Sequence, residues 1–307
     1  MKRILSLGLA LIVVSAGLLS LSACSSSSGE EAKEPTTVPA VYTESAVTVE
    51  KSSEEVLKYF NTILNNVKAE KPRMYYRFEK NVPNDSLKVT KAGQEEADVD
   101  SSLSAINDAA KAVKDLMLEN IKENSGELAF GADNTDVLLV QGESFASKLT
   151  ADDVKYATMT EVGDKYFITI EFDDITEEAA KEVLSKAFNL RDKADILNSE
   201  EFAKTKAYLE LKDYSVVYSG CRIKATVNRL TNQIETVEYF KVANVTASAT
   251  GKGTFEAHSD LSILFTLEDK SYYEMYWENE DPTSPLETTT AAPIVEATMT
   301  ETAAAAQ

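Results

Sequence analysis

The sequence predicts an α+β domain in which an antiparallel, curved sheet packs against several helices. Three observations carry this prediction. Apolar residues recur at helical spacing near the start of the domain, a Gly163-Asp164 hairpin signal lies near its middle, and alternating apolar residues fill its last hundred positions. Adjacent strands joined by short turns form an antiparallel meander, and a helix or a bound apolar molecule must cover its inner face.

The domain is expected to open with a helix that follows Ser52. Ser52 and Glu55 have the spacing of a capping box, and Pro72 ends the helical pattern. The inward stripe is Val56, Leu57, Phe60, Ile63, Leu64 and Val67. Alternation over residues 74–79 then predicts a strand, and a loop with Pro83 follows it.

A second helix is predicted over residues 101–122, with Asn124-Ser125-Gly126 at its end. Residues 126–150 carry the weakest pattern, and within them residues 137–140 suggest a short buried strand. Strands over 154–161 and 165–172 flank the Gly163-Asp164 turn.

Two further helices are expected before the final strands. One begins near Thr176 and turns Ala180, Val183, Leu184 and Ala187 inward. A shorter one starts at Ser199 and carries Phe202, Ala203 and Leu209. The order of elements also suggests two degenerate copies of one unit, although no fixed-period residue identity supports it.

The meander is predicted as strands over 217–228, 234–241, 244–257, 261–267 and 272–277. The strand at 244–257 has an apolar face made of small residues and two glycines, Gly251 and Gly253. We therefore expect close packing on that face, or a bend in the strand.

The N-terminus carries an export signal. Lys2 and Arg3 precede an apolar run from Ile4 to Leu21, which is the layout of a secretory signal. The run Leu21-Ser22-Ala23-Cys24 resembles the lipobox of bacterial lipoproteins. That resemblance implies removal of residues 1–23 as a signal peptide and attachment of lipid, such as palmitate, to Cys24. The alternatives are a plain secretory signal and an uncleaved anchor helix.

Four regions follow from this layout. After the signal peptide (1–23), a flexible tether (24–50) rich in Ser, Glu, Thr and Pro leads to the globular domain (51–277). A Thr/Ala/Pro-rich tail (278–307) is predicted to be disordered. The expected location is the extracytoplasmic face of the cell membrane, where Cys24 supplies the membrane contact through its lipid.

The composition excludes some partners. The formal net charge of −20 argues against nucleic acid, because phosphates need Lys and Arg to neutralise them. It also argues against a polybasic second contact with the membrane. With Cys24 acylated, Cys221 is left as a lone thiol, and strand alternation places it among core-facing residues, where a buried inert thiol is expected.

No catalytic set, metal site or cofactor is predicted. His258 is the only histidine and is expected at the surface, and no Gly-x-Ser-x-Gly elbow supplies a nucleophile. The pairs Asp152-Asp153 and Asp173-Asp174 suggest turn and cap residues more than an acid/base couple. The cluster Asp133-Asn134-Thr135-Asp136 offers oxygen ligands but lacks the glycine and distant glutamate of a calcium loop. Gly251-Lys252-Gly253 suggests a bulge rather than a phosphate loop.

The aromatic residues near the end of the domain form the candidate binding surface. Tyr272, Tyr273, Tyr276 and Trp277 lie in one predicted strand. Alternation turns Tyr273, Met275 and Trp277 to one side, and Tyr272 and Tyr276 to the other. Tyrosine and tryptophan favour interfaces and sugar platforms, and ordinary packing is the alternative.

These observations favour a non-enzymatic binding or interaction module at the cell surface, with a protein, a glycan or a small molecule as its partner. A carrier or sensor that holds an apolar ligand between sheet and helices is the first alternative. In element order and anchor, the chain resembles the half-barrel-with-helix lipoproteins that carry lipids between bacterial membranes, which implies the carrier. A hydrolase that uses only carboxylates is the second alternative.

Overall fold

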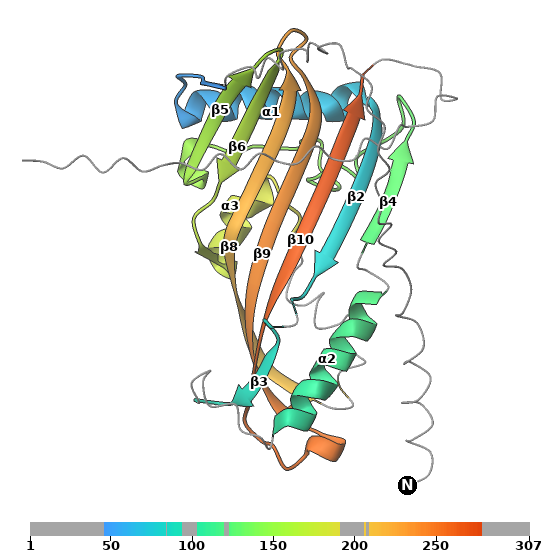
Figure 1. Cartoon of the computed structure of the whole chain (residues 1–307), viewed down its shortest axis with the longest axis vertical. Helices are drawn as coiled ribbons and strands as arrows, with labels where there is room; N and C mark the ends of the chain where they lie inside the picture. The colour runs from blue at the N-terminus through green and yellow to red at the C-terminus, as the bar shows by residue number, and fades with distance from the viewer. Residues whose placement is uncertain are drawn as a thin grey trace, which may run out of the picture. The chain divides into compact units, whose positions relative to one another are not determined.

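The computed structural model describes residues 46–83, 85–93, 103–119, 123–190, 206 and 209–277. Within them, one antiparallel sheet of ten strands dominates the fold (Figure 1). Eight strands follow the order β1-β5-β6-β8-β9-β10-β2-β4, while β3 pairs with β10 and β7 with β8. The strands are β1 (Val47–Thr48), β2 (Arg73–Asn81), β3 (Lys88–Lys91), β4 (Glu123–Leu128), β5 (Tyr156–Val162), β6 (Lys165–Glu171), β7 (Ile175–Thr176), β8 (Leu209–Asn228), β9 (Gln233–Gly251) and β10 (Leu261–Tyr276).

The predicted α+β class, with a sheet packed against several helices, is wrong. The fold is mostly antiparallel sheet, and the described residues hold three α-helices: α1 (Ser53–Glu70), α2 (Ser104–Glu119) and α3 (Glu177–Val183). The difference arises because β8, β9 and β10 are 20, 19 and 16 residues long. Long paired strands satisfy their backbone groups in the sheet, so fewer residues remain for helices.

Strand β9 is continuous where the sequence suggested two strands. Its ladder with β10 runs from Thr236 to Ala249 without a register shift. The apolar pattern is interrupted at Lys241, an inward position by register. Lys241 is accommodated there because its ammonium lies 3.3 Å from the Asp269 carboxylate of the neighbouring strand. The charged residue of this ion pair interrupts the apolar pattern, so the sequence suggested a break where the strand is continuous.

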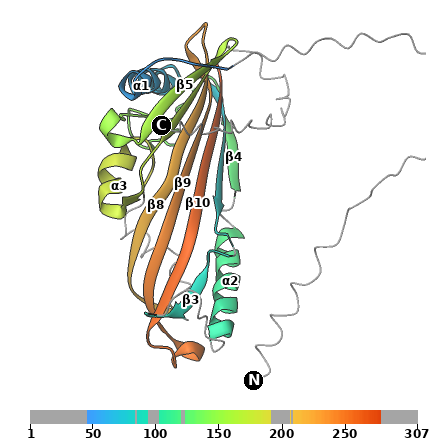
Figure 2. The ribbon, with the colours of Figure 1, turned by 60° about the vertical axis from the view of Figure 1, so that its left-hand side comes forward.

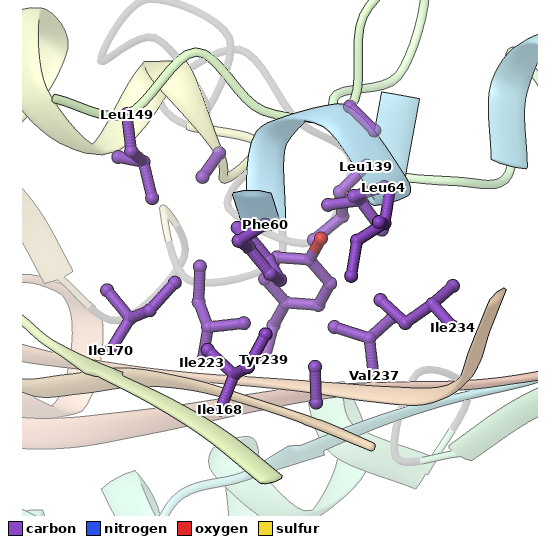
Figure 3. Close-up of a cluster of buried hydrophobic side chains, with 14 of the residues drawn as sticks. Phe60, Leu64, Leu139, Leu149, Ile168, Ile170, Ile223, Ile234, Val237 and Tyr239 are labelled. Carbon is purple, nitrogen blue, oxygen red and sulfur yellow. The ribbon is translucent and has the colours of Figure 1, made fainter. Parts of the chain in front are cut away.

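One face of the sheet carries the main core. Helices α1 and α3 lie on that side of the strands (Figure 2). Figure 3 shows the Tyr239 ring of β9 between Phe60 and Leu64 of α1, with Ile223 of β8 and Ile168 of β6 nearby. All five side chains are buried. Burial of such side chains contributes about 1.5–3 kcal/mol each, so this face holds α1 on the sheet.

A second, smaller core lies at the other end of the long strands, where Figure 1 shows α2 and β3. Its buried residues are Val89, Leu103, Ile106, Ala249 and Leu261. Tyr239 and Ala249 are an even number of residues apart in an unbroken ladder, so both clusters form on the same face of β9.

Helix α1 begins as predicted. The Ser52 hydroxyl accepts from the Glu55 N–H at 3.3 Å, and the Glu55 carboxylate accepts from the Ser52 N–H at 2.9 Å. The capping box is therefore confirmed, as is the inward stripe, whose six members are buried. The helix ends at Glu70, before Lys71 in the left-handed region, with φ +52.

The hairpin and the third helix are also confirmed. β5 and β6 pair around the Gly163-Asp164 turn. Helix α3 follows Thr176, and Ala180, Leu184 and Ala187 are fully buried. The helix is shorter than expected, because a turn of 3₁₀ helix (Leu184–Lys186) succeeds it.

Three local predictions are wrong. Asn124-Ser125-Gly126 does not end a helix but lies in β4, where Gly126 leaves room for the Tyr76 ring; a Cβ there would be 2.4 Å from the Tyr76 hydroxyl. Residues 88–91, expected in a loop, form β3. Residues 137–140 form turns rather than a strand, although Leu138 and Leu139 are buried.

The predicted strand over 244–257 ends early. β9 stops at Gly251, and Gly253–Phe255 form a 3₁₀ turn that folds back on it. A Cβ on Gly251 would lie 2.0 Å from the Phe255 carbonyl oxygen. The glycine therefore permits this reversal, and the close packing expected on this face comes from Phe255.

Side chains of α1 hold the irregular loop 129–150. The Asn65 carboxamide accepts from the N–H groups of Ala146 and Ser147 and donates to the Ser147 carbonyl at 3.0 Å. Asn61 donates to the Leu149 carbonyl, and Lys68 donates to the Glu143 carbonyl, each at 2.8 Å. The polar flank of α1 thus supplies the partners that a loop without secondary structure lacks.

The remaining predictions for the chain ends lie outside the described residues. These are the signal peptide, Cys24, most of the tether, the tail and the helix starting at Ser199. Where the structure resumes, Val47–Thr48 of the predicted tether form β1 on the edge of the sheet, and Leu209 begins β8 instead of ending a helix.

Candidate functional site

The four predicted surface aromatics are divided between the two faces of the sheet, as alternation predicted. Tyr273 is fully buried, and its hydroxyl donates to the Val137 carbonyl at 3.0 Å. Its ring meets the Tyr239 ring edge-on, with centroids 6.0 Å apart. Trp277 also packs against the main core. The four residues therefore do not form one binding surface.

Tyr272 and Tyr276 lie half-buried on the outer face, each covered by an arginine. The Arg77 guanidinium is 6.0 Å from the centre of the Tyr272 ring, and that of Arg73 is 5.4 Å from the Tyr276 ring. Partial burial, with Glu274 nearby, raises the pKa of Tyr272 to about 12. Each guanidinium makes a cation–π contact with its ring.

A groove lies beside Trp277, between α1 and the turn that joins β8 to β9. Its volume is about 490 Å³, within the range of about 300–1,000 Å³ that is typical of small-ligand sites. Helix α1 contributes Tyr59, Thr62, Ile63, Asn66 and Glu70. The opposite wall is the segment Thr231–Gln233, and Trp277 completes the lining.

Helical geometry explains the α1 wall of the groove. Tyr59, Thr62, Asn66 and Glu70 are spaced three or four residues apart, so they share one flank of the helix. This flank borders the buried stripe at Ile63 and is turned away from the loop 129–150. The spacing is visible in the sequence, but nothing there shows that the β8–β9 turn lies opposite.

Both aromatic rings of the groove are held in place. The Trp277 indole N–H donates to the Ile234 carbonyl at 2.7 Å. The Tyr59 ring meets Tyr166 edge-on at 6.2 Å, and its hydroxyl donates to the Asn232 side-chain oxygen at 3.0 Å. Burial, with Tyr166 nearby, raises the pKa of Tyr59, which favours the protonated hydroxyl that donates this hydrogen bond.

The groove contains one carboxylate and no cationic side chain. Glu70 is exposed at one end, and the other polar lining groups are amides and hydroxyls. Lys51 is not part of the lining, but its ammonium lies 5.3 Å from the centre of the Tyr59 ring. Such a site offers hydrogen bonds and ring faces, and its lining holds one carboxylate rather than the two of a glycosidase-type pair.

The remaining candidate residues from the sequence take part in contacts that belong to the fold. The Asp153 carboxylate accepts from the Thr150 N–H at 2.8 Å and lies 2.5 Å from the Lys186 ammonium, which makes it a cap residue. The Asp133 carboxylate accepts from the Thr135 hydroxyl at 2.9 Å.

Cys221 is buried, and burial raises the pKa of its thiol. Gly251 and Gly253 flank the end of β9, while the His258 N–H donates to the Phe255 carbonyl.

Within the described ranges, no three histidine, cysteine, aspartate or glutamate side chains are grouped so that they would hold a metal ion. In the same part of the chain, none of the helices is both long enough and apolar enough to cross a membrane.

The fold and the groove define a class of protein: a long antiparallel sheet, covered by helices on one face, with a mixed polar and aromatic groove beside its first helix. No known protein family, curated protein or solved structure matches the chain.

Proposed function

We propose that the protein is a lipid-anchored, extracytoplasmic binding module without catalytic activity, and that it binds its ligand in the groove between α1 and the β8–β9 turn. The observation that carries the proposal is the groove itself. Two fixed aromatic rings, Tyr59 and Trp277, stand beside exposed amides in a space of small-ligand size.

The anchor part of the proposal rests on the lipobox at Leu21–Cys24. Two or three acyl chains hold a protein stably on a bilayer, at about 0.8 kcal/mol per buried methylene. Radiolabelled palmitate is expected to label the chain, and Cys24→Ala is expected to abolish both the label and membrane retention. Retention of the variant would contradict the anchor.

The binding part is tested by photo-cross-linking on intact cells. A photoreactive amino acid at position 62, in place of the exposed Thr62, lies in the groove wall and leaves its amide side chains intact. The same amino acid at position 158 replaces Thr158, an exposed residue on the outer face of β5. We expect an adduct from position 62 that position 158 does not give, and its loss in an Asn232→Ala background. Equal labelling from both positions, or none from position 62, would contradict a ligand site in the groove.

A carrier of apolar ligands receives less support. That hypothesis needed space over the small-residue face of residues 245–257. Phe255 packs directly on Gly251 there, while the groove lies at the opposite end of β9, beside Gln233. The groove also mixes polar and apolar groups, which suits a partly polar ligand better than a lipid chain.

A further inference from the structure

We infer that the groove between α1 and the β8–β9 turn binds a neutral carbohydrate; this inference rests on the proposed function and names its ligand class. A sugar ring has apolar C–H faces and a rim of hydroxyl groups that both donate and accept hydrogen bonds. The groove presents the complementary groups: two aromatic rings and several amide and hydroxyl side chains.

The amide side chains of the groove are the groups that would pair with the hydroxyls of a sugar. Asn66 and Gln233 line the groove, and neither side chain has a hydrogen-bond partner among the described residues. A carboxamide offers two donor hydrogens and an acceptor oxygen, so each pairs with a sugar hydroxyl in either direction. Asn232 uses its oxygen to accept from Tyr59, which leaves its NH₂ group as a donor.

The aromatic rings of the groove are the groups that would stack on the apolar face of a sugar. Trp277 is fixed by its bond to the Ile234 carbonyl, and Tyr59 is fixed by Asn232 and by the Tyr166 ring. Rings that are already ordered lose little conformational entropy when a ligand stacks on them. The volume of about 490 Å³ has room for a short oligosaccharide rather than a single small ion.

Charge argues against the two main competing ligand classes. An anionic ligand would meet the Glu70 carboxylate with no lining cation to neutralise it. A cationic ligand would find only the exposed Glu70 carboxylate to pair with, and the Lys51 ammonium, 5.3 Å from the centre of the Tyr59 ring, already takes a cation's place on that ring. A cation also only donates hydrogen bonds, so the amide NH₂ groups would gain nothing from it. A neutral ligand with both donors and acceptors fits best.

The chain provides its own reporter for the test. Trp277 is its only tryptophan and lies in the groove lining, so its emission reports on the groove alone. The full chain, in a detergent without a sugar headgroup, is titrated with neutral oligosaccharides (cellobiose, maltotriose, mannobiose and chitotriose). Tri-galacturonic acid and trilysine serve as the anionic and cationic arms, and calorimetry accompanies every titration.

We expect saturable binding of at least one neutral oligosaccharide at millimolar concentration or below, with neither charged ligand binding. Asn66→Leu, which keeps the side-chain size and removes the amide, should weaken that binding about tenfold. Asn81→Leu, the same change at an exposed asparagine outside the groove, should leave it unchanged.

Two results would overturn the inference: no neutral oligosaccharide binds by either method, or Asn66→Leu and Asn81→Leu bind equally well. If photo-cross-linking from position 62 still gives an adduct, the ligand class is wrong but the binding module stands. If that adduct is also absent, the proposed function fails with it.

Discussion

The Tyr59 hydroxyl donates a hydrogen bond of 3.0 Å to the side-chain oxygen of Asn232, 173 residues further along the chain. This contact joins α1 to the β8–β9 turn, and both residues line the groove. Asn232 has a φ of +56, a left-handed conformation that asparagine tolerates better than most residues. The turn thereby brings its side chain within reach of the helix.

We expect Tyr59→Phe to remove only this hydrogen bond, because the ring keeps its contact with Tyr166. Since the pair is exposed, the free energy of unfolding should fall by no more than about 1 kcal/mol. A double-mutant cycle with Asn232→Ala, measured by urea unfolding, should give a coupling energy of about 0.5–1 kcal/mol. Additive single effects would mean that the two side chains do not interact in solution.

Asn65→Ala should destabilise the protein much more. It leaves the N–H groups of Ala146 and Ser147 without the carboxamide oxygen that accepts from both, and Ala146 is fully buried. We expect a loss of about 2–4 kcal/mol in urea unfolding and faster proteolysis within residues 129–150. The matched control is Asn66→Ala, one residue along on the exposed flank, which should change the stability little. Similar losses from the two variants would refute the role of Asn65.

Asp153 should make the stability depend on pH. Burial acts to raise the pKa of its carboxyl, but hydrogen bonds from Lys186 and Thr150 outweigh burial and hold the pKa below the ordinary 3.8. Its stabilisation is therefore present above pH 3.8 and is lost as the pH falls through the lower, folded-state pKa.

The variant Asp153→Asn should cost about 1.5–3 kcal/mol at pH 7, and its difference from the wild type should shrink below pH 3.8. Urea unfolding at pH 7 and pH 3 measures both values. Asp152→Asn, at the exposed neighbouring position, should show neither effect. A pH-independent difference for Asp153→Asn would show that the charge of the carboxylate does not contribute.

Gly251→Ala should disturb the end of β9. The new Cβ would lie 2.0 Å from the backbone oxygen of Phe255, which cannot move without reopening the 3₁₀ turn. We expect a loss of about 1–3 kcal/mol in the free energy of unfolding. Gly126→Ala is the comparison, because its Cβ would meet the far end of the Tyr76 side chain, which shifts more easily than backbone. Equal losses would contradict this distinction.

Much of the local structure followed from the sequence. The spacing of Ser52 and Glu55 predicted the start of α1, and the Gly163-Asp164 pair predicted the β5–β6 hairpin. Alternation also separated Tyr273 from Tyr272, which lie on opposite faces of β10. These features depend on residues close together in the chain, so their patterns are visible there.

The balance of sheet and helix did not follow from the sequence. In β4, Gly126 lies against the Tyr76 ring of the neighbouring β2, and in β9 the charged Lys241 is paired with Asp269 of β10. Neither partner is near in sequence, so the local pattern indicated a helix end in one case and a break in the other.

The candidate site, too, followed only in part from the sequence. The sequence by itself determined that Trp277 lies at the end of a strand and that Tyr59, Asn66 and Glu70 share one flank of a helix. Only the tertiary structure decided that this flank lies opposite the turn at Asn232, so that a groove forms between them. A groove needs two walls, and here its walls come from segments that meet only when α1 packs on the sheet.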